Sequence, residues 1–167
     1  MYCVTTGWGS VLKLAQSSPT ANTGKLSLVY KGDVVHAAFD NVAFTDANHL
    51  AVVEDAGDTL HTQRNALDSG YLLDVTKNYA DPVNKPLRFL AEGRDPSATL
   101  DSAFLGMPGF QNDGDNEITG LHVSDGDPGI GGILGAKAPT PFTNGWRIFY
   151  TQQHGDNPTW EIIPAVR

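Results

Sequence analysis

The chain has 167 residues, 40% of them hydrophobic, which is enough for a single domain with a packed core. Nineteen acidic residues against 11 basic ones give a formal net charge of −8, which argues against nucleic acid as a partner. No run approaches the roughly 18 consecutive apolar residues of a membrane span, and the first residues lack the basic and apolar regions of a secretory signal.

Glycine and proline punctuate the chain in a way that is typical of a mainly β protein. Eighteen glycines and ten prolines separate short apolar runs, as turns separate strands. The expected strands, in chain order, are Leu26–Lys31, Asn41–Phe44, His49–Glu54, Tyr71–Val75, Leu87–Glu92, Ile118–Val123, Trp146–Gln152 and Trp160–Ile163. One short helix is expected at Pro96–Phe104, inside a long loop.

The four strands between Asn41 and Glu92 are expected to form one four-stranded antiparallel sheet. Thr45–Asn48 is a polar connection suited to the hairpin between the first two of them. The pattern restarts near residue 117, so the single β-rich domain 1–167 divides into two blade-like units, 26–92 and 117–167. We expect antiparallel four-stranded sheets arranged as blades of a partial β-propeller. The alternative is a β-sandwich, because no strict repeat in residue identity accompanies the strand spacing.

An acidic stretch precedes the expected strand at Ile118. Asp113, Asp115 and Glu117 supply oxygen ligands that suit a hard cation such as Ca²⁺. The sequence DGDN around Asp113 and Asp115 also forms a good turn and fails the EF-hand pattern, so turn residues are the preferred interpretation there. His154, in QQHGDN, is a candidate ligand or proton carrier, although a histidine that shapes the turn is the preferred interpretation.

Three motifs resemble a known family. The run from Phe39 to Asp58, FDNVAFTDANHLAVVEDAGD, is similar to the blade signature of calcium-dependent propeller enzymes. The runs RFLAEG, NEITGLHVSDGD and WRIFYTQQHGDNPTWEI then follow in the order found in the C-terminal part of the PhoX-type alkaline phosphatases. The chain resembles these proteins over most of Phe39–Ile162. The resemblance implies a propeller that holds calcium and iron (Ca²⁺ and Fe³⁺) on its axis and hydrolyses phosphate monoesters, in the periplasm or outside the cell.

The resemblance also implies metal ligands. Glu54 in VVED and Glu117 in EITGL match positions from which the family supplies carboxylates to its metals. Asp55 is a weaker candidate, since side chains alternate along a strand and Asp55 would point away from Glu54. Asn41, with Asp40 in the FDN motif, is expected at the same axial end, either as a ligand or as a residue that fixes a turn.

The chain also departs from the family. A complete propeller needs more residues than 167, so we expect either a missing propeller segment or self-association through unpaired strand edges. The one cysteine, Cys3, excludes an internal disulfide, leaves the compartment open and has no metal-ligand context. No GxSxG elbow is present, so a hydrolase of this sequence would be metal-based. The alternative function is a non-catalytic, calcium-stabilised structural or binding module.

Overall fold

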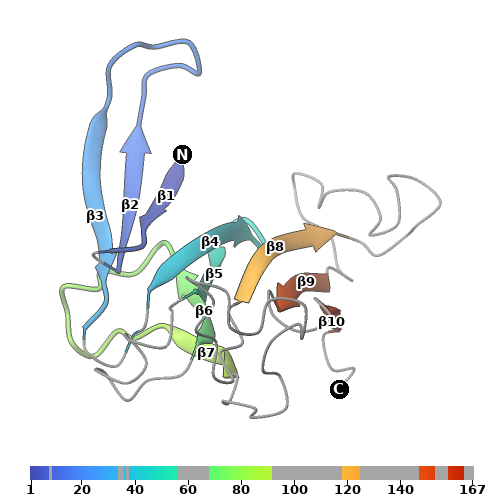
Figure 1. Cartoon of the computed structure of the whole chain (residues 1–167). Coiled ribbons are helices and arrows are strands. Elements are labelled where there is room, and N and C mark those ends of the chain that lie inside the picture. Colours follow the sequence, from blue (N-terminus) through green and yellow to red (C-terminus); the bar gives the residue numbers. More distant parts are fainter. Residues whose placement is uncertain are drawn as a thin grey trace, which may run out of the picture.

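The computed structural model describes residues 1–7, 9–33, 36, 38–55, 68–91, 118–124, 147–152 and 158–163. Within these residues the chain is all-β, as predicted, and its strands form three antiparallel sheets (Figure 1). The strands are β1 (Tyr2–Thr5), β2 (Ser10–Ala15), β3 (Lys25–Lys31), β4 (Phe39–Phe44), β5 (His49–Glu54), β6 (Ser69–Asp74), β7 (Leu87–Ala91), β8 (Ile118–Ser124), β9 (Arg147–Gln152) and β10 (Thr159–Ile162).

The first sheet has the order β1-β2-β3 and contains two strands that the sequence analysis missed, β1 and β2. β3 was expected within the unit 26–92, and it pairs with β2. A bulge between Val11 and Leu12 shifts the register of this pair. The β2–β3 hairpin extends beyond the body of the molecule (Figure 1).

The central sheet has the order β4-β5-β6-β7 and confirms the predicted four-stranded antiparallel sheet. The β4–β5 turn forms where the polar connection predicted it. The carboxylate of Asp46 accepts hydrogen bonds from the backbone N–H groups of Asn48 and His49, at 2.7 and 2.8 Å. Such side-chain-to-backbone bonds are the reason that Asp is favoured in turns.

The third sheet has the order β10-β9-β8. β8 carries a bulge between Thr119 and His122, and Gly120 lies there with φ of 62°. This left-handed conformation is readily available to glycine and costly for most other residues, so the glycine is needed where the strand bends.

The central sheet lies between the other two sheets, and side chains alternate along β5 toward each of them. On one face, Leu50 and Val52 join a core cluster with Val11 of the first sheet, against which Tyr2, Val4 and Tyr30 pack. On the other face, Ala51 packs with Val123 and Ile148, and Val53 packs with Ile118 and Tyr150. The described residues therefore form a stack of three sheets, and within them the stack does not close into a ring.

Candidate functional site

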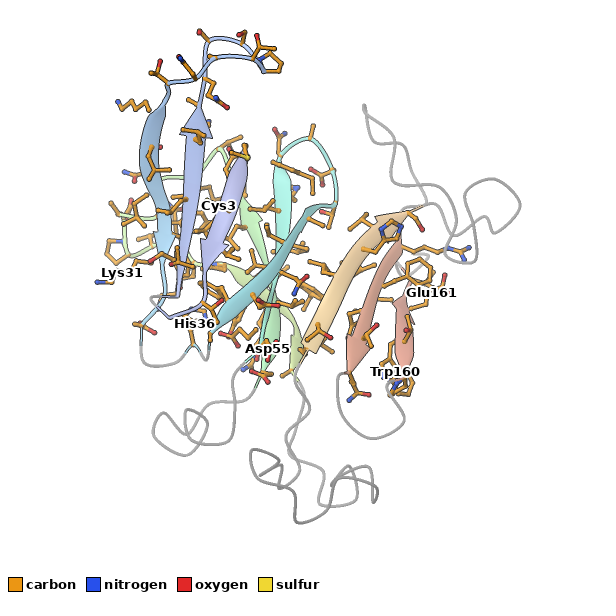
Figure 2. The ribbon with its side chains drawn as sticks, turned by 45° about the horizontal axis from the view of Figure 1, so that its top comes forward. Cys3, Lys31, His36, Asp55, Trp160 and Glu161 are labelled. Atoms are coloured by element: carbon orange, nitrogen blue, oxygen red, sulfur yellow. The ribbon has the colours of Figure 1, made fainter. Side chains whose placement is uncertain are left out.

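Buried polar side chains gather at one end of the central sheet, where β5 ends and β4 and β6 begin. Glu54 is the last residue of β5 and pairs with Phe39, the first residue of β4. Its side chain is completely buried, with 0% exposure. Figure 2 shows His36 and Asp55 at this same end of the sheet. A carboxylate without solvent must be compensated by hydrogen bonds or by a cation, so Glu54 marks the site to be explained.

His36 links Glu54 to the first sheet. Its Nδ1 lies 3.1 Å from Oε1 of Glu54, and its Nε2 lies 2.6 Å from the hydroxyl of Tyr30. When Glu54 is ionised it can only accept, so Nδ1 of His36 is the donor of that contact, and when the imidazole is neutral its Nε2 accepts from the Tyr30 O–H. The three side chains form a continuous hydrogen-bonded chain, the Tyr30–His36–Glu54 relay.

Aromatic rings surround His36, whose exposure is only 3%. The ring centroids of Tyr71 and Phe39 lie 4.6 and 5.0 Å from that of the imidazole. Burial raises the pKa of Tyr30 to about 12, and the nearby charges of Asp33 and Glu54 act in the same direction. Burial, followed by the charge of Glu54, also raises the pKa of Tyr71. Both phenols therefore stay protonated at neutral pH, so the Tyr30 hydroxyl has a proton that it can donate to His36.

The two carboxylates of the VVED motif belong to opposite faces of the central sheet. The backbone N–H of Asp55 donates to the carbonyl of Ala38 at 2.8 Å, which extends the β4–β5 ladder beyond Glu54. Alternation along this ladder puts Asp55 on the face of Val53, toward β8, and Glu54 on the face of Val52, toward the first sheet. Asp55 is half-buried, whereas Glu54 is closed off from solvent.

Asn41 lies in a bulge of β4. The register between β4 and β5 shifts between Phe39 and Val42, so β4 has one residue more than β5 over this stretch. The side-chain amide of Asn41 donates to the carboxylate of Asp40. Both side chains are half-buried, and their mutual hydrogen bond is the contact expected of residues that shape the backbone locally.

Several candidates from the sequence lie outside the described residues. They are the predicted ligand Glu117, the acidic residues Asp113 and Asp115, His154 and the predicted helix Pro96–Phe104. The residue that follows Glu117 in the chain is described: Ile118 begins β8 and packs with Val53, the residue before Glu54. The sequence neighbours of the two predicted carboxylate ligands therefore meet in one apolar cluster.

Residues that no sequence motif indicated complete this end of the sheet. Asp68 and Ser69 are buried at the start of β6, and the β5–β6 register, extended by one residue, brings Ser69 across from Glu54. His36 and Tyr30 were also missed as site residues. The only sequence signal for Asp68 and Ser69 is their position before an apolar run. His36 contacts Glu54, which lies 18 residues later in the chain, and no local sequence pattern reveals such a contact.

The described residues supply carboxylate oxygens, which suit calcium, but they do not by themselves assemble a metal site. In the described part of the chain, no group of three or more His, Cys, Asp or Glu side chains is close enough to hold an ion. Calcium takes roughly six to eight oxygen ligands, so a site at Glu54 would need further donors.

Comparison with known proteins adds no family to this geometry. No family model, curated protein or solved structure matches the chain. Among the described residues, no helix has the length and apolar character to cross a membrane. The fold defines the class: an all-β protein built of stacked antiparallel sheets.

Proposed function

We propose that this chain forms consecutive blades of a propeller-type, metal-dependent phosphatase, and that Glu54 supplies a carboxylate to its calcium and iron centre. The observation that carries the proposal is the complete burial of Glu54 at the end of β5. Burying an ionised carboxylate is costly, and proteins accept the cost mainly where the charge is paired or binds a cation.

The arrangement of the sheets supports the blade interpretation. Each sheet is an up-and-down meander in chain order, and each stacks face to face on the next one. The first strands of the second and third sheets, β4 and β8, also pack against each other, as inner strands of neighbouring propeller blades do. A sandwich would need two sheets only, and the described residues already form three.

The ligand set combines residues from the fold and from the resemblance. Glu54 is the primary ligand, held by the relay, and Asp55 is a secondary one on the face toward β8. Glu117 is assigned from the sequence resemblance alone. Asn41 is retained as an outer ligand. A bound metal pair would neutralise the charge of a phosphate ester.

The residues of the relay have a defined task in this proposal. His36 donates from Nδ1 to Oε1 of Glu54 and fixes the carboxylate's orientation. Tyr30 fixes the tautomer of His36 by donating to Nε2. Hydrogen bonds of this kind orient metal ligands and tune their basicity.

The test is hydrolysis of a generic aryl phosphate after reconstitution with calcium and iron. We expect metal-dependent hydrolysis by the native chain and loss of it in Glu54→Gln, which is nearly isosteric but uncharged. Asp74→Asn is the matched control, because Asp74 is a carboxylate at the opposite end of the sheet. Its Oδ1 accepts hydrogen bonds from the backbone N–H and the hydroxyl of Thr76. Hydrolysis that is undetectable in the native chain, or equal in both variants, would contradict the proposal.

A second candidate function, a non-catalytic β module, is favoured by one specific observation. The relay compensates Glu54 from within the chain, since Oε1 already accepts from His36. In that case folding needs no metal, and chelation leaves the melting temperature unchanged. The phosphatase proposal instead predicts that calcium raises the melting temperature, because a ligand that binds only the folded state stabilises it.

A further inference from the structure

We draw no further inference here: the strongest candidate, the apolar outer face of the first sheet around Leu12, Leu26 and Leu28, carries none, because nothing in the described part of the chain shows what covers it.

Discussion

Replacing Tyr30 by Phe tests whether the relay holds Glu54 in place. The substitution keeps the ring, and with it the contacts to Phe39 and Tyr79 at centroid distances of 6.0 and 5.3 Å. It removes the 2.6 Å hydrogen bond to Nε2 of His36 and leaves a buried acceptor without its donor. An unsatisfied buried group costs about 1–3 kcal/mol, so we expect unfolding free energy to fall by that amount.

Urea unfolding measures this loss. With an m-value of about 1–3 kcal/mol/M for a chain of this size, the midpoint should fall by about 1 M. Tyr2→Phe is the control, because the Tyr2 ring packs on Phe44 at 5.3 Å while its hydroxyl has no hydrogen-bond partner among the described residues. We expect that control to stay within about 0.5 kcal/mol of the native chain. Equal urea midpoints for Tyr30→Phe and Tyr2→Phe would show that the hydrogen bond from Tyr30 to His36 does not stabilise the fold.

Three further features can be tested by substitution: the phenol of Tyr30, the turn at Asp46 and the tight contact at Gly70. The pKa of Tyr30 is raised to about 12 in the folded chain, above its ordinary value of 10.0. The stability that Tyr30 contributes should therefore be full below about pH 10 and fall toward pH 12. The urea midpoint of Tyr30→Phe should decrease less over this pH range than that of the native chain. Desolvation opposes ionisation of Asp46, but hydrogen bonds from the turn prevail and lower its pKa. Asp46→Ala should therefore cost about 1 kcal/mol of stability at neutral pH, and less at acid pH, where the native carboxylate is protonated. An equal cost at neutral and acid pH would contradict this prediction. A Cβ added to Gly70 would lie 2.6 Å from the Phe89 ring, so Gly70→Ala should lower the free energy of unfolding by about 1–3 kcal/mol. The control Gly7→Ala, whose Cβ would meet nothing within 4 Å, should leave stability nearly unchanged. Similar melting temperatures for the two variants would contradict the tight packing at Gly70.

The sequence predicted the central sheet well because its signals are local. The polar turn at Thr45–Asn48 lies between two apolar runs, and the strand predicted at His49–Glu54 is β5 to the residue. Two strands of the first sheet, β1 and β2, escaped prediction, and for β2 the reason is physical. The run SVLKLA of β2 has apolar residues on both faces of its sheet, with Val11 toward the core and Leu12 and Leu14 on the other face, so it does not show polar–apolar alternation with a period of two.

The candidate site was predictable only in part. Glu54 was selected through its motif, and the structure shows it buried at a strand end. Its partners His36 and Tyr30 come from outside the central sheet, 18 and 24 residues earlier in the chain, and are brought to it by the packing of two sheets. A local sequence pattern carries no information about such a contact, so Tyr30, His36 and Asp68 appear only in three dimensions.

Metal ligation by Glu54 is tested most directly by the metal content of the purified chain, measured by mass spectrometry after supply of calcium and iron, for the native chain and for Glu54→Gln. We expect bound metal in the native chain and a loss of at least about tenfold in metal affinity in the variant, as when a ligand is removed. A native chain that binds no metal, or a variant that binds as much as the native chain, would contradict it and favour the structural module held together by Tyr30, His36 and Glu54.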